Sequence, residues 1–177
     1  MTSRFVMIAL AASAAIALSA CSDGPSTGTP RPATETTTTS TSVGKDTASL
    51  AETDPCSLLT SSEASELGAS GTPKREKVGT ADVCKWRKPG EGNFDVSVRA
   101  NLGLEQVKPD GGQIADLTVG KGNRKAKKVS GDGSGVCIIA LDVSPSSRVD
   151  VSALGRPNED SCPVALKLAE LVDPKLP

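Results

Sequence analysis

The chain has 177 residues, 20 basic and 21 acidic side chains and a net charge of −1, so no strong electrostatic field points to nucleic acid. It has no histidine and no tyrosine, which excludes Ser-His-Asp and Cys-His nucleophile systems, histidine metal ligands and the commonest general base. Aromatic residues make up 2% of the chain, too few for a base-stacking platform. We therefore expect no nucleic-acid partner, no cofactor and no metal site.

Residues 1–20 have the pattern of a secretory signal peptide, with a single charge at Arg4, an apolar run and small residues at the end. As a helix, an apolar run of about 14 residues rises only ~21 Å, short of the ~30 Å hydrocarbon layer, which favours a removed segment over a permanent span. Leu18-Ser19-Ala20-Cys21 resembles the lipobox of bacterial lipoproteins. That resemblance implies cleavage before Cys21 and acylation of its thiol. An ordinary signal peptide followed by an unrelated cysteine is the alternative.

Residues 21–52 are expected to form a disordered linker behind the lipidated cysteine. They are rich in threonine, serine, proline and glycine, and they hold little that a core could bury. A flexible chain of about 30 residues has a root-mean-square reach of roughly 30 Å. Such a linker would hold a domain clear of the lipid headgroups.

Residues 53–177 have the size of one domain, and its first elements are expected to be helical. Asp54 can cap a first turn that begins at Pro55. Thr60 and Glu63 have the spacing of a capping box, and Gly68 is placed to end the short helix that follows.

Strands are expected where the hydrophobic period changes to two. Residues 83–87 and 94–100 alternate on either side of a Pro-Gly turn and should form a hairpin. Residues 136–143 are nearly all apolar, as in a central strand covered on both faces, and 148–154 alternate beside them. Residues 101–128 are hard to interpret, with one short strand signal at 117–119. A last helix should run from Asp160 or Ser161 to about Val172.

This order of elements predicts an α+β fold. It consists of a single antiparallel sheet of about 4–6 strands packed with N- and C-terminal helices and held by two disulfides.

The five cysteines divide into Cys21 and an even set of four. An even set in an exported chain indicates two disulfide bonds, and none of the four has the short C-x-x-C spacing of a zinc or redox site. Four cysteines allow three pairings. We favour Cys56–Cys84 and Cys137–Cys162, because each pair would tie a terminal helix to a strand, with about 3–4 kcal/mol of stabilisation apiece.

Several stretches together resemble one family. They are Asp54-Pro55-Cys56-Ser57-Leu58-Leu59-Thr60 with Glu63-Ala64, then Cys84-Lys85-Trp86, Gly135-Val136-Cys137-Ile138 and a last helix that carries Cys162. The pattern resembles the actinobacterial lipoprotein family catalogued only as domain of unknown function 3558, from about Asp54 to Leu171 and at the lipobox. The resemblance implies a cell-envelope lipoprotein with paired cysteines. It brings no activity and no catalytic residue with it.

One run of cations is a candidate binding site for an anionic partner. The run consists of Lys121, Arg124, Lys125, Lys127 and Lys128. Such a run can meet anionic headgroups or wall polymers, at ~1 kcal/mol per cation near a charged surface. The alternative is a solvated strand edge, where lysines also prevent pairing with another sheet.

These features predict a non-enzymatic module at the outer face of the cytoplasmic membrane. Membrane lipid would hold it through acylated Cys21, and its partner would be an envelope protein or a wall polymer. The alternative is a carrier or sensor of a small apolar or lipidic ligand between sheet and helix. An enclosed apolar cavity would favour the carrier, and a filled interior with an exposed contact surface would favour the module.

Overall fold

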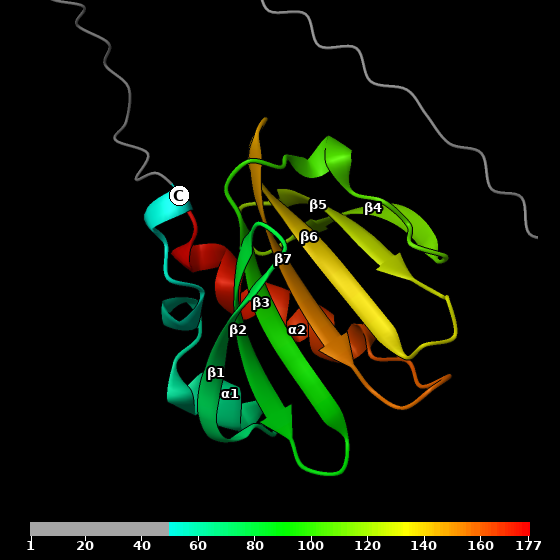
Figure 1. Cartoon of the computed structure of the whole chain (residues 1–177). Coiled ribbons are helices and arrows are strands. Elements are labelled where there is room, and N and C mark those ends of the chain that lie inside the picture. Colours follow the sequence, from blue (N-terminus) through cyan, green and yellow to red (C-terminus); the bar gives the residue numbers. More distant parts are fainter. Residues whose placement is uncertain (1–49) are drawn as a thin grey trace, which may run out of the picture. The chain divides into compact units, whose positions relative to one another are not determined.

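The computed structural model describes residues 50–177, which form one antiparallel sheet of seven strands in the order β1-β2-β3-β7-β6-β5-β4 (Figure 1). The predicted signal peptide, Cys21 and the linker up to residue 49 lie outside the described residues. The strands are β1 (Ser70–Val78), β2 (Ala81–Lys88), β3 (Gly92–Arg99), β4 (Gln113–Val119), β5 (Arg124–Ser130), β6 (Val136–Ser144) and β7 (Ser147–Leu154).

Short helical elements precede, interrupt and follow the sheet. The 3-10 turns are η1 (Leu50–Glu52), η2 (Pro55–Leu58), η3 (Leu104–Gln106) and η4 (Asp173–Lys175), and the α-helices are α1 (Ser61–Glu66) and α2 (Cys162–Val172). The predicted capping box forms at the start of α1, where Thr60 and Glu63 satisfy each other's backbone N–H groups. The α-helix that follows this capping box is only six residues long, and the helical elements before it are the 3-10 turns η1 and η2.

The strand count of four to six was wrong, because β1 and β5 were not predicted. Every residue of β1 is exposed or half-buried, so this edge strand has no buried face that could produce an alternating pattern. β5 coincides with the basic run and buries only Ala126 and Val129. The predicted hairpin is present as β2 and β3, which pair from Asp82↔Val98 to Lys88↔Gly92.

The domain also begins earlier than residue 53. Leu50, assigned to the linker from its sequence context, is 5% exposed and belongs to the hydrophobic core. Its turn η1 packs against β3. A single apolar residue within a threonine-rich segment carries no periodicity, so the sequence could not show that it is buried.

The core lies on the sheet face that α2 covers (Figure 1). One row of paired residues crosses four strands on this face: Cys84, Val96, Val151 and Ile139, all without exposed surface. Leu168 and Val172 of α2 are also fully buried and belong to the same cluster. Trp86 stacks on Phe94 within this core, with ring centroids 5.7 Å apart.

Two disulfides connect the helical segments to the sheet. Cys56 of η2 is bonded to Cys84 of β2, and Cys137 of β6 is bonded to Cys162 at the start of α2. These are the pairs that the sequence favoured. Each bond closes a chain segment of 28 or 25 residues and holds a helical element over the core row.

Candidate functional site

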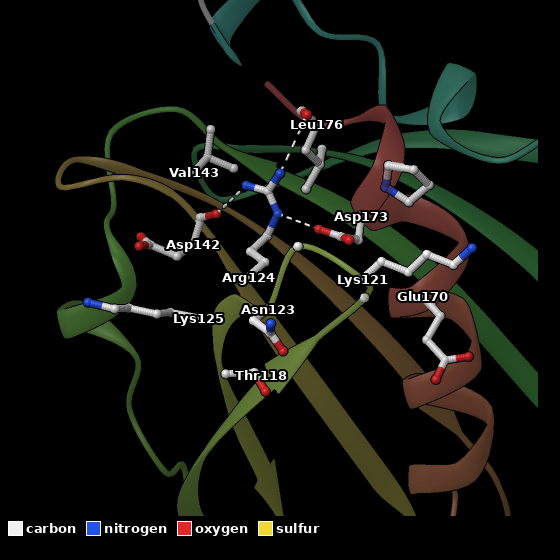
Figure 2. A pocket seen from close by; sticks show the side chains of 13 residues that line it. Thr118, Lys121, Asn123, Arg124, Lys125, Asp142, Val143, Glu170, Asp173 and Leu176 are labelled. Carbon is white, nitrogen blue, oxygen red and sulfur yellow. Dashed lines mark hydrogen bonds and ion pairs between the residues drawn. The ribbon is translucent and has the colours of Figure 1, made fainter.

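A hollow of about 1280 Å³ lies where the β4–β5 turn, the end of β6 and the C-terminal end of α2 meet (Figure 2). We call it the α2 hollow. It is lined by Thr118, Gly120, Lys121, Gly122, Asn123, Arg124, Lys125, Asp142, Val143, Glu170, Asp173, Pro174 and Leu176.

The turn that forms one wall of the α2 hollow depends on two left-handed residues. Gly120 has a φ of +69° and Asn123 a φ of +50°, both in the region that glycine and asparagine tolerate best. Gly120 is also pressed against η4, because a Cβ atom there would lie 1.8 Å from Oδ2 of Asp173. A side chain at this position would therefore push the turn away from the end of α2.

Arg124, the first residue of β5, holds the other parts of the α2 hollow together. Its Nε donates to Oδ1 of Asp173 at 2.6 Å, and its Nη1 donates to the carbonyl of Asp142 at 2.7 Å. Its Nη2 donates to the backbone oxygen of Pro177 at 3.2 Å. Figure 2 shows the guanidinium between Asp173, Asp142 and Leu176, whose carbonyl also accepts from Nη2 at 3.5 Å. The side chains of Arg124 and Asp173 are only 18% and 11% exposed, so this pair is largely shielded from water.

The five predicted cations do not form one surface. Lys121, Arg124 and Lys125 line the α2 hollow, but Lys125 points away from Lys121 and from α2 in Figure 2. Lys127 forms an ion pair with Glu105 of η3, in which Nζ of the lysine lies 3.1 Å from Oε1 of the glutamate. Lys128 is opposite Ile139 in the register and therefore belongs to the other sheet face from Lys127.

The charges that line the α2 hollow balance. Against Lys121, Arg124 and Lys125 stand Asp142, Glu170 and Asp173. Since Arg124 and Asp173 neutralise each other, the hollow presents lysines and carboxylates side by side and does not form a uniformly basic surface. Such a lining suits a polar partner with charges of both signs better than a polyanion.

The acidic half of this lining was missed from the sequence. Asp173 comes directly after the predicted last helix and before Pro174, and no pattern in the sequence marks it. Its partner Arg124 is 49 residues away in the chain, so no local spacing connects them. Besides the basic run, the available signal for this region is the Gly-Lys-Gly-Asn stretch, because two glycines and an asparagine mark a tight turn between strands.

A family model described as "Protein of unknown function (DUF3558)" matches residues 16–175. The chain belongs to this family. No curated protein and no solved structure matches the chain significantly. The family predicted from the Asp-Pro-Cys opening and the later cysteine motifs is thereby confirmed, while the lipoprotein character that came with it stays a prediction.

In this DUF3558 member, η4 also joins the α2 hollow to the N-terminal turns. Lys175 of η4 donates to the carbonyl of Leu58 at 3.1 Å and to Oε2 of Glu63. Partial burial would raise the pKa of Glu63, but hydrogen bonds from Lys175 and Thr60 outweigh it and hold the pKa below its usual value. The capping box is thus also an attachment point for the end of α2.

Residues 50–177 of this family member contain no group of three histidine, cysteine, aspartate or glutamate side chains placed to hold a metal ion. Within the same residues no helix is both long and apolar enough to cross a membrane.

Proposed function

We propose that this family member is a non-enzymatic binding module, tethered by acylated Cys21 at the outer face of the cytoplasmic membrane. Its partner is an envelope protein or a wall polymer, and the contact surface is the α2 hollow. The lipobox-like Leu-Ser-Ala-Cys sequence supports the tether, and the threonine-rich segment behind it supplies the reach.

The observation that carries this proposal is the filled interior of the domain. The space between sheet and α2 is occupied by close-packed side chains, and Phe94, Ile139, Leu141 and Leu168 are among those with no significant exposure. A carrier of an apolar ligand needs an enclosed apolar cavity of several hundred Å³ in this place. The filled interior therefore favours the module over the carrier.

We choose the α2 hollow as the contact surface because its walls are fixed. Arg124 ties the β4–β5 turn, β6 and η4 to one another, and the Cys137–Cys162 bond holds the other end of α2. A rigid surface loses little conformational entropy on binding, so a modest set of polar contacts is sufficient for affinity. Lys121 and Glu170 remain exposed at its rim to meet a partner.

Site-specific photo-crosslinking of the intact protein in its native envelope tests the proposal. A photoreactive residue at position 121 should capture a protein or a wall polymer, which mass spectrometry identifies. The same residue at position 77 is the control, because Lys77 is exposed but lies on β1 at the opposite edge of the sheet. Capture of lipid alone at position 121 would favour the carrier, and equal capture at both positions would refute a contact surface at the α2 hollow.

A further inference from the structure

The sheet face opposite α2 carries a second concave site, which we call the β6 groove. The chain between β3 and β4 passes from one half of the sheet to the other (Figure 1), and its turn η3 packs against β6. Between this segment and the strands lies a groove of about 470 Å³. That volume lies within the range of ligand sites, roughly 300–1,000 Å³.

The floor of the β6 groove is apolar. It is formed by Val129 of β5 with Ile138 and Ala140 of β6, whose side chains share the sheet face away from α2. Leu102 and Val107 of the crossing segment add apolar surface to its wall. Ile138, Leu102 and Val107 are half-buried, so the groove keeps apolar surface in contact with water. Burying that surface under a ligand is favourable.

One end of the groove is built from a charged triad that is rich in arginine. Arg148 is 7% exposed and grips Asp150 with two hydrogen bonds, from Nε to Oδ1 at 2.6 Å and from Nη2 to Oδ2 at 3.2 Å. Its Nη1 donates to the carbonyl of Gly103 at 2.9 Å. All three donor nitrogens of Arg148 are thus used inside the protein, and Arg148 alone neutralises Asp150.

Arg99 is the second cation of this triad and is not needed to neutralise it. Its Nε donates to Oδ2 of Asp150 at 3.1 Å. Its two Nη groups have no hydrogen-bond acceptor within residues 50–177. Every fully buried side-chain nitrogen in that range does have an acceptor, so the two Nη groups must be in contact with solvent. The triad has two positive charges against one negative charge, and the surplus charge lies at the end of an apolar groove.

From this arrangement we propose that the β6 groove binds a carboxylate attached to an apolar body, with the carboxylate on the free Nη groups of Arg99 and the body on the half-buried side chains of Ile138 and Leu102. A planar guanidinium fork matches a carboxylate in geometry and charge better than any other anion-binding side chain does. Lys108 and Asp110 at the rim offset each other, so the surplus charge at Arg99 decides the ligand's sign. The inference is independent of the tether and of the α2 hollow.

The same ligand chemistry has two sources, the C-terminal residue of a peptide and a free carboxylic acid. We would therefore titrate the purified full chain in a calorimeter with N-acetyl-alanyl-leucine and, separately, with hexanoate. Each is compared with its own primary amide, which has the same apolar body without the charge. We expect a carboxylate to bind at least about tenfold more tightly than its amide, since a charge-assisted bidentate contact is lost.

The variants Arg99→Gln and Arg87→Gln locate the binding. Arg87 is an exposed arginine of β2 that does not line the groove, so R87Q should keep the affinity of the wild type while R99Q loses the preference for the carboxylate. If R99Q does not fold, amide chemical shifts of the wild-type chain give the answer, because binding should move the signals of Ile138 and Leu102. Binding of the peptide alone assigns the groove to chain ends, and binding of hexanoate alone assigns it to free acids. Equal affinity for carboxylate and amide, or no binding of either carboxylate, would overturn the proposal.

Discussion

Replacing Arg124 by methionine should destabilise the domain by about 3 kcal/mol, because it leaves the largely buried carboxylate of Asp173 without its cation. Methionine keeps much of the length and apolar stem of arginine but cannot donate to Asp173, to the Asp142 carbonyl or to Pro177. Breaking a buried ion pair from one side costs roughly 3–5 kcal/mol. We take the lower end, since the side chain of Arg124 is 18% exposed and water can reach part of the site.

Urea unfolding of the full chain, followed by far-ultraviolet circular dichroism, measures this change in the free energy of unfolding. Lys125→Met is the matched control, because Lys125 is the next residue, is exposed, and should change stability by less than about 0.5 kcal/mol. Adding Asp173→Asn to Arg124→Met should recover part of the loss, since the uncompensated charge is removed. An Arg124→Met variant as stable as Lys125→Met would refute the claim that Arg124 fixes the walls of the α2 hollow.

The Cys137–Cys162 disulfide and the carboxylates of Asp95 and Glu63 each affect stability in a way that can be measured. Replacing both Cys137 and Cys162 by alanine should lower the free energy of unfolding by about 3.5 kcal/mol from loop entropy, measured in urea; a loss below about 1 kcal/mol would contradict it. Burial raises the pKa of Asp95 above its ordinary 3.8, so the folded domain loses stability as the pH rises from 3.8 through the raised pKa and the buried carboxyl ionises. Asp95→Asn should therefore stabilise the domain more at pH 7 than at pH 3. An equal effect at the two pH values would refute the raised pKa. The pKa of Glu63 is lowered, so the ionised carboxylate stabilises the fold above its ordinary pKa of 4.5, and this stabilisation is lost as the pH falls through the lowered pKa of the folded state. Glu63→Gln should therefore be destabilising at pH 7 and nearly neutral in strong acid. Thermal melts across this pH range test the prediction, and a pH-independent loss of stability would refute it.

The strands that the sequence predicted well are those with apolar residues facing the core. β2 and β3 alternate because Cys84, Trp86 and Phe94 all belong to the hydrophobic core, and the core residues of β7 also recur at every second position. β1 could not be found in this way, since an edge strand exposed on both faces has no reason to alternate. The disulfide pairs could be favoured because tying each terminal helical element to a strand is a geometric requirement that spacing and element order already express.

The sites were less accessible to prediction, since their partners are distant in sequence. Lys127 belongs to the basic run, and its partner Glu105 is 22 residues away in η3, so no local spacing connects the two. The triad of Arg99, Arg148 and Asp150 lies on the other face of β3 and β7 from the apolar residues whose alternation predicts these strands. The available signal was that two adjacent central strands, β3 and β7, both carry charged residues of both signs on the face away from the apolar residues. Such residues must pair with one another when that face of the sheet is covered.

The state of Cys21 tests the central claim of a tethered module most directly. Mass spectrometry of the N-terminal peptide of the protein isolated from its native cells gives this state without any assumption about the partner. We expect a mature chain that begins at Cys21, carries a diacylglycerol on the thiol and is recovered with the membrane fraction. An unmodified Cys21, or a mature chain released freely into the medium, would show that lipid does not hold the domain at the membrane.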